Sequence, residues 1–204
     1  MQGSAGQTTA IQSCLERMRL GDPAARDELF VHASRRLYRL AHKMLQGFPG
    51  VRRWEETDDV VQQAAIRLSR ALSAETPTSV AHFFRLAAVQ IRRELIDLSR
   101  RLYGPEGMGA HHHTGRPAGD DSTPHPYEAQ ANTDGPATLA RWTEFHEAAK
   151  KLPSDERDVF DLHYYGDLML KEVAEALNIS ERTARRRWRS AKLILFEYCD
   201  VGLT

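Results

Sequence analysis

The sequence predicts an all-α protein built as two small helical domains joined by a flexible linker. Apolar residues recur at helical spacing through most of the 204 residues, and no stretch alternates as a β-strand would. Residues 103–136 are instead rich in Gly, Pro, His, Asp, Ser and Thr, and have too few aliphatic residues to form a core. We therefore expect an N-terminal domain at residues 9–102, a linker at 103–136 and a C-terminal domain at 137–199.

The N-terminal domain is expected to begin with two helices. Residues 1–8 are small and polar, and we expect them to be disordered. A first helix over residues 9–20 ends at Gly21. Asp22 and Pro23 then supply a capping residue and a residue suited to the first helical position. The long apolar stripe that follows predicts a second helix.

Two further helices complete this domain. Thr57 is the expected cap of the third helix, and Asp58 and Asp59 lie in its first turn, where the helix dipole favours acidic side chains. A loop at residues 73–79, which contains a proline, leads to a fourth helix over residues 80–102.

The fourth helix combines core positions with a basic face. We expect Phe83 and Phe84 to be buried rather than to stack on the bases of single-stranded DNA. Arg93, Arg100 and Arg101 fall at helical offsets 0, 7 and 8, which places them on one face. Such a face can follow a phosphate backbone.

The C-terminal domain is predicted to contain four helices. The first spans residues 137–151. Ser154 is the expected cap of the second, over residues 155–165, which Gly166 ends. The last two helices lie in residues 168–195, which read LMLKEVAEALNISERTARRRWRSAKLIL.

A short helix, a tight turn and a longer basic helix are typical of a helix-turn-helix, whose second helix enters the DNA major groove. The turn is residues 178–180, in which Ile179 is an apolar plug and Ser180 caps the second helix. Ala174 is small where the helices must approach, and Trp188 gives the second helix a buried side. The second helix carries the basic residues Arg182, Arg185, Arg186, Arg187, Arg189 and Lys192.

The positive charge is local. The chain has 28 basic and 28 acidic residues, whereas residues 179–192 hold six basic residues and one acidic residue. A chain that neutralises so few phosphates would bind duplex DNA weakly by itself, so we expect a partner to supply most of the DNA contact. Cys14 and Cys199 show neither metal-ligand nor disulfide spacing. No membrane span or signal peptide is predicted, and we expect a cytoplasmic protein.

No enzyme signature is found, because the sequence has no phosphate-binding glycine loop, nucleophile elbow or paired-histidine metal motif. The acidic group Glu55, Glu56, Asp58 and Asp59 is interpreted as a helix N-terminus that faces a protein partner, rather than as an acid–base or metal site. The three histidines at residues 111–113 lie in the linker and are not expected to form a preformed metal site. We predict no cofactor and no metal.

From about residue 11 to residue 195, apart from the linker, the chain resembles bacterial sigma factors of the sigma-70 family, extracytoplasmic-function (ECF) group. These proteins keep only conserved regions 2 and 4. The likeness rests on GDPAARDELF followed by RRLYRLA, on ETDDVVQQAAIRL, on FFRLAAVQIRRELIDLSRR, and on LPSDERDVF with the helix-turn-helix after it. Four such motifs in the right order make the resemblance specific.

The resemblance implies a factor that binds core RNA polymerase, recognises −10 and −35 promoter elements and assists strand opening. The implied partners are the polymerase β′ clamp helices and β flap, promoter DNA and an anti-sigma factor. Contact with the clamp helices is implied for Asp58, Asp59, Val61, Gln62 and Gln63. Contact with the −10 element is implied for Arg92, Arg93, Asp97, Arg100 and Arg101, with a flipped base held at residues 73–79. Contact with the −35 element is implied for Ser180, Arg182, Thr183, Arg185, Arg186 and Arg189.

Two other classes stay open at this point. A stand-alone helix-turn-helix repressor or activator would use the same final helices, but it has no need of the acidic third helix or the basic fourth helix. An enzyme could build a metal site from the histidine run and the Asp58-Asp59 pair. Metal bound after purification would identify such an enzyme.

Overall fold

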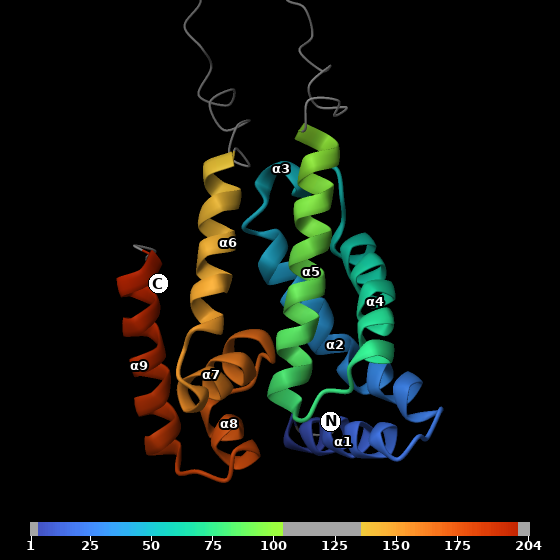
Figure 1. Ribbon diagram of the computed structural model, residues 1–204, viewed down its shortest axis with the longest axis vertical. Coiled ribbons are helices and arrows are strands. Elements are labelled where there is room, and N and C mark those ends of the chain that lie inside the picture. The colour runs from blue at the N-terminus through green and yellow to red at the C-terminus, as the bar shows by residue number, and fades with distance from the viewer. Residues whose placement is uncertain (1–3, 104–135, 200–204) are drawn as a thin grey trace, which may run out of the picture.

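The computed structural model describes residues 4–103 and 136–199, which form helices joined by short turns and loops (Figure 1). The N-terminal half consists of α1 (Ser4–Arg19), α2 (Ala25–Leu45), α3 (Pro49–Arg52), α4 (Thr57–Ala74) and α5 (Val80–Tyr103). The C-terminal half consists of α6 (Pro136–Lys150), α7 (Ser154–Phe160), the π-helical turn η3 (Asp161–Tyr165), α8 (Leu170–Ala176) and α9 (Glu181–Cys199). The predicted all-α class is confirmed for these residues. The predicted linker at residues 103–136 lies outside them except at its two ends, where Tyr103 is the last residue of α5 and Pro136 is the first of α6.

The N-terminal half is built around α2, because the apolar stripe of this helix is buried along its length. α1, α4 and α5 all pack on α2, and α5 also packs on α1 and α4. Phe83 and Phe84 of α5 are fully buried and meet edge to face with ring centroids 5.1 Å apart, which confirms that both belong to the core.

α1 begins earlier than the sequence indicates, so the expectation of disorder is wrong for residues 4–8. The reason is a tertiary contact. Thr8 is buried, and its hydroxyl accepts a hydrogen bond from Nη1 of Arg36 on α2 at 3.0 Å. A polar N-terminal turn is therefore held by a partner 28 positions away, which no local pattern reveals.

Several predicted helix starts are displaced by one or two residues. α2 begins at Ala25, and Asp22 instead accepts a hydrogen bond from the backbone N–H of Ala24 at 2.9 Å. Thr57 and Ser154 are the first helical residues of α4 and α7 and do not cap them. The short helix α3 was not predicted, because four residues are too few to show a periodic pattern.

The two halves pack against each other through one continuous apolar core. The halves meet where α5 packs against η3 and α7 and where α1 packs against α8, while α4 packs on α5 and α9 packs on α6 (Figure 1). Trp142 of α6 lies against Phe48, which precedes α3, with ring centroids 5.8 Å apart. No pattern in the sequence indicated this contact between the halves.

A buried histidine near this contact leads to a prediction about pH. His146 of α6 lies 2.7 Å from the hydroxyl of Tyr165 and is 5% exposed. Burial, aided by the nearby charge of Arg92, lowers the pKa of His146 to about 3. The unfolded chain takes up a proton on this ring below about pH 6.5, whereas the folded chain does not. The stability that His146 contributes is therefore complete above that pH and is lost as the pH falls toward 3.

We expect His146→Phe to flatten the pH dependence of the free energy of unfolding, by about 2 kcal/mol between pH 7 and pH 5. Asp161 acts in the opposite direction, because burial raises its carboxyl pKa to about 7 against the attraction of Arg85. The informative quantity is thus the difference between the wild type and the variant, measured by chemical denaturation at both pH values. If the free energy of unfolding changes equally with pH in the wild type and the variant, the prediction is contradicted.

Candidate nucleic-acid interface

The turn between α8 and α9 has the geometry that a helix-turn-helix requires. Asn178 adopts a φ of 52°, a left-handed conformation that asparagine tolerates well. The backbone N–H of Ile179 then bonds to the carbonyl of Ala174 at 3.0 Å. Ser180 Oγ accepts from the backbone N–H of Thr183 at 3.1 Å, which confirms its predicted role as the cap of α9.

One side of α9 is fixed against the rest of the C-terminal half. Ala174 and Ala184 are buried, as expected for helices that approach closely. Trp188 stacks on Phe160 with ring centroids 6.0 Å apart and meets His163 edge to face at 4.5 Å. Since Trp188 is held from within, the opposite side of α9 is turned outward.

The outward side of α9 is strongly basic, with Arg182, Arg185, Arg186 and Arg189 all exposed. Arg185 donates to Glu181 at 2.9 Å, one helical turn earlier. Arg182, Arg186 and Arg189 make no ion pair within the described residues, and their offsets of 0, 4 and 7 place them on one face. These three cations are available to phosphates or base edges.

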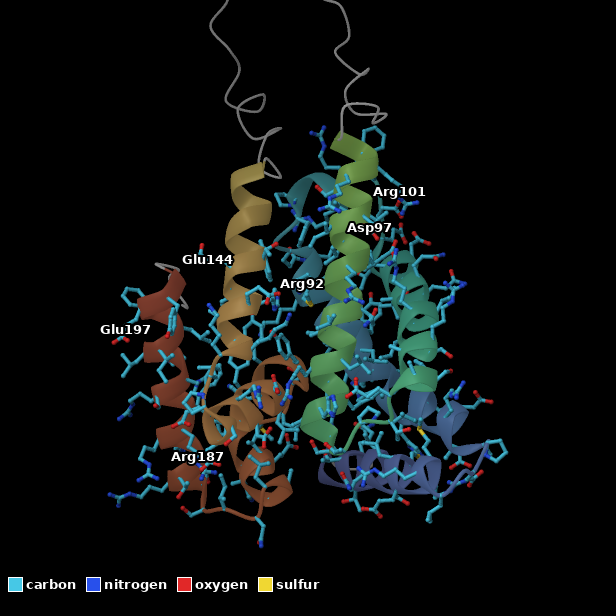
Figure 2. All side chains as sticks on the ribbon, viewed as in Figure 1. Arg92, Asp97, Arg101, Glu144, Arg187 and Glu197 are labelled. Atoms are coloured by element: carbon cyan, nitrogen blue, oxygen red, sulfur yellow. The ribbon has the colours of Figure 1, made fainter. Side chains whose placement is uncertain are left out.

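Not all of the predicted −10 residues are exposed on α5. Arg93, Arg100 and Arg101 face solvent, as the helical offsets predict. Arg92 is only 8% exposed, projects between α5 and α6, and pairs with Glu147 at 3.2 Å (Figure 2). Asp97 pairs instead with Arg67 of α4 at 2.8 Å.

The predicted polymerase-binding residues lie together on α4. Asp58, Asp59, Gln62 and Gln63 are exposed, whereas Val61 packs partly against the core. Four of the five side chains therefore form an open polar surface near the start of α4.

The predicted loop at residues 73–79 is shorter in the structure, because α4 continues to Ala74, and residues 75–79 are tied to α1 and α5. The backbone carbonyl of Pro77 accepts from Arg19 of α1 at 3.0 Å. Ser79 Oγ accepts from the backbone N–H of His82 at 3.1 Å and so caps α5. Thr78 at the tip of the loop is exposed.

Two arginines that the sequence did not single out organise these surfaces. Arg67 donates to Glu94 and Asp97, both at 2.8 Å, and thereby joins α4 to α5. A groove of about 730 Å³ beside Arg67 is lined by Asp59 and Gln63 from one predicted surface and by Asp97 and Arg101 from the other. Arg85 bonds to Asp161 at 2.6 Å, across the contact between the halves. The role of neither arginine could be predicted from the sequence of its own helix, because the carboxylates that it binds lie on other helices.

Among residues 4–103 and 136–199, no three His, Cys, Asp or Glu side chains are grouped as a metal ion would require. The three histidines at residues 111–113 lie outside these residues. In the same part of the chain, no helix has the length and apolar character needed to cross a bilayer. A model of the ECF sigma factor family matches residues 8–200. A search of curated proteins finds no match.

Proposed function

Because the chain belongs to the ECF sigma factor family, whose members bind RNA polymerase and direct promoter-specific transcription initiation, we propose a specific role for each of its exposed surfaces. The start of α4 binds the clamp helices of the polymerase. α9 reads a −35 element, and α5 with the preceding loop recognises and opens a −10 element.

The observation that carries this proposal is the outward face of α9. Its three unpaired arginines project from a helix that Ser180 caps and Trp188 anchors. A helix of this kind fits the major groove of duplex DNA, where the arginine guanidinium can pair with both acceptors on a guanine edge.

The proposed role of α5 follows from its exposed cations. Arg93, Arg100 and Arg101 can bind the phosphates of a melted strand. The loop at residues 73–79 is proposed to hold an unstacked base, which offsets part of the free energy lost when stacking is broken. Because the net charge of the chain is zero, polymerase must provide most of the remaining contact with DNA. An anti-sigma partner stays a prediction of the sequence.

Run-off transcription with purified bacterial core polymerase tests the proposal. Fragments of the source genome, including the region upstream of this coding sequence, would serve as templates. We expect promoter-specific transcripts only when the chain is added, and we expect Asp59→Arg combined with Gln62→Ala to abolish them. Glu144→Arg, an exposed change on α6, is the control and should leave transcription intact.

Two results would count against this function. Transcripts that persist in the Asp59→Arg, Gln62→Ala variant would show that α4 is not the docking surface. The absence of transcripts, together with tight sequence-specific binding of duplex DNA by the chain alone, would instead favour a stand-alone repressor or activator.

A further inference from the structure

The loop that joins α4 to α5, residues 75–79, lies beside α1 and is held from two helices (Figure 1). Pro77 is buried, and its backbone carbonyl accepts from Arg19 of α1 at 3.0 Å. The backbone N–H of Thr78 donates to Nδ1 of His82 on α5 at 3.3 Å. Thr78 is exposed at the tip of the loop. The contacts with Arg19 and His82 therefore set how this tip is presented to a ligand.

The bond to Thr78 fixes the protonation of the His82 ring. A backbone N–H can only donate, so Nδ1 of His82 must carry no proton. The proton of the neutral ring is therefore on Nε2, which lies 3.3 Å from Oε1 of Glu75 and donates to it. A second proton, on Nδ1, would bring two N–H groups together and break the bond to Thr78. The ring thus joins both ends of the loop only in its neutral form.

The surroundings of His82 favour this neutral ring. The side chain is partly buried, and burial lowers the pKa of the ring below its ordinary value of about 6.5. Arg85 on α5 and Arg157 on α7 also lower it. Glu75 of the loop and Asp158 of α7 act against them. At neutral pH, Nδ1 is therefore available as an acceptor, and it is lost only as the pH falls below about 6.5.

The position of His82 differs from that of a side chain that caps α5 alone. Ser79 caps this helix, because its Oγ accepts from the backbone N–H of His82 at 3.1 Å. In an ordinary capping box, the side chain three residues after the cap returns to the N–H of the cap residue itself. His82 has this position but reaches one residue further back, to Thr78. Its side chain therefore fixes the loop as well as the first turn of the helix.

We propose that His82, in its neutral Nε2–H form, is the positioning residue of this loop and holds Thr78 in place to receive an unpaired base. This role rests on the proposed function, in which the loop holds a base of the −10 element. Ordering a loop when a ligand arrives reduces the free energy of binding, whereas a loop that is already ordered avoids this cost. The gain matters here because unstacking a base is itself unfavourable.

Two substitutions of His82 separate the positioning role from helix capping. His82→Asn places Oδ1 near the position of Nδ1, so it keeps the bond to Thr78 but cannot titrate. His82→Gln can form an ordinary capping box with the N–H of Ser79, but it has no acceptor at the position of Nδ1. α5 stays capped in both variants, and only the second one releases Thr78. His32→Gln, which changes a histidine of α2 outside the proposed DNA-binding surfaces, is the control.

Nuclear magnetic resonance of the free chain tests the contact itself. Near neutral pH, we expect the ¹⁵N shifts of His82 to show the Nε2–H form and the amide of Thr78 to be protected from hydrogen exchange. After correction for the intrinsic effect of pH on exchange, this protection should fall in the pH range in which the ring takes up a proton. Protection should be independent of pH in His82→Asn, absent in His82→Gln, and as in the wild type in His32→Gln.

Run-off transcription with core polymerase tests the link to the base. The templates are a promoter found by the assay above and versions with one abasic nucleotide at each position of the non-template −10 strand. On the intact promoter, we expect His82→Gln to reduce transcripts roughly five-fold, the effect of one hydrogen bond, and His82→Asn to retain wild-type yield. One abasic position should impair the wild type. At that position, His82→Gln should cause no further loss, because the base is already missing.

The proposal is overturned if Nδ1 of His82 carries the proton near neutral pH, or if Thr78 is unprotected in the wild type. It is also overturned if His82→Gln reduces transcripts equally on the intact and the abasic promoter, because the residue then acts on something other than the base. Failure of the proposed function is seen instead in the wild type, as an absence of transcripts or of any sensitive abasic position, and this proposal fails with it. Failure of the proposal alone is seen in the resonance spectra or in the His82 variants, with normal transcription by the wild type.

Discussion

Replacing Phe160 by alanine is expected to destabilise the C-terminal half by about 3–5 kcal/mol. Phe160 is fully buried and stacks on Tyr164 with ring centroids 4.9 Å apart. It also meets Tyr165 at 5.2 Å and both Phe145 and Trp188 at 6.0 Å, so truncation leaves a cavity among four aromatic rings. Since Trp188 anchors α9, this helix would lose its support together with the core.

Thermal unfolding followed by circular dichroism measures this effect. For a chain of about this size each kcal/mol shifts Tm by roughly 2–4 °C, so a decrease on the order of 10 °C is expected. Phe196→Ala removes the same ring from the same half at a position that is 55% exposed, and should change Tm little. Equal shifts for the two variants would mean that Phe160 does not have the packing role described here.

Removal of a single exposed arginine from α9 is expected to reduce promoter-specific transcription by roughly 10- to 100-fold, which corresponds to the 1–3 kcal/mol typical of a base contact. Arg186→Ala is the variant of choice, because Arg186 is exposed at the centre of the unpaired face. The neighbouring Arg187→Ala is the matched control. Arg187 pairs with Asp155 of α7, so it faces the protein rather than the groove (Figure 2).

The assay is run-off transcription with polymerase on a promoter and on versions with single substitutions in the −35 element. A base contact predicts that Arg186→Ala also relaxes discrimination at one position of the element. A phosphate contact predicts uniform weakening and a salt slope reduced by about 1. If Arg187→Ala impairs transcription as much as Arg186→Ala does, α9 enters the groove by a different face or does not enter it.

Local sequence patterns predicted the helices well and their first residues less well. The apolar periodicity of α5 and the Ser180 cap of α9 lie within the segments that they specify, and both were confirmed. The start of α1 depends instead on Arg36, which belongs to another helix. Thr57 has the right chemistry for a cap, but the backbone turns one residue earlier, and a residue preference alone does not fix that angle.

In the candidate interface, too, features set by a local pattern could be predicted, and features set by contacts between helices could not. The outward face of α9 depends only on helical offsets, so its exposed arginines could be predicted. The helical offsets of α5 placed Arg93 and Arg100 correctly, but they carry no information about Glu147, which buries Arg92, or Arg67, which binds Asp97. Contacts between helices decide which charged residues stay available, and a single sequence does not display those contacts.

The end of α5 and the start of α6 leave the body on the same side (Figure 1). Residues 104–135 join them, so the two halves remain covalently tethered whether they are packed or apart. The composition of these residues predicts a flexible tether, and a tether of that kind typically holds its two ends at an effective concentration near the millimolar range. A contact between the halves that is tighter than about 1 mM, or roughly 4 kcal/mol, therefore stays formed in the intact chain, whereas the two halves made as separate chains would dissociate at micromolar concentrations.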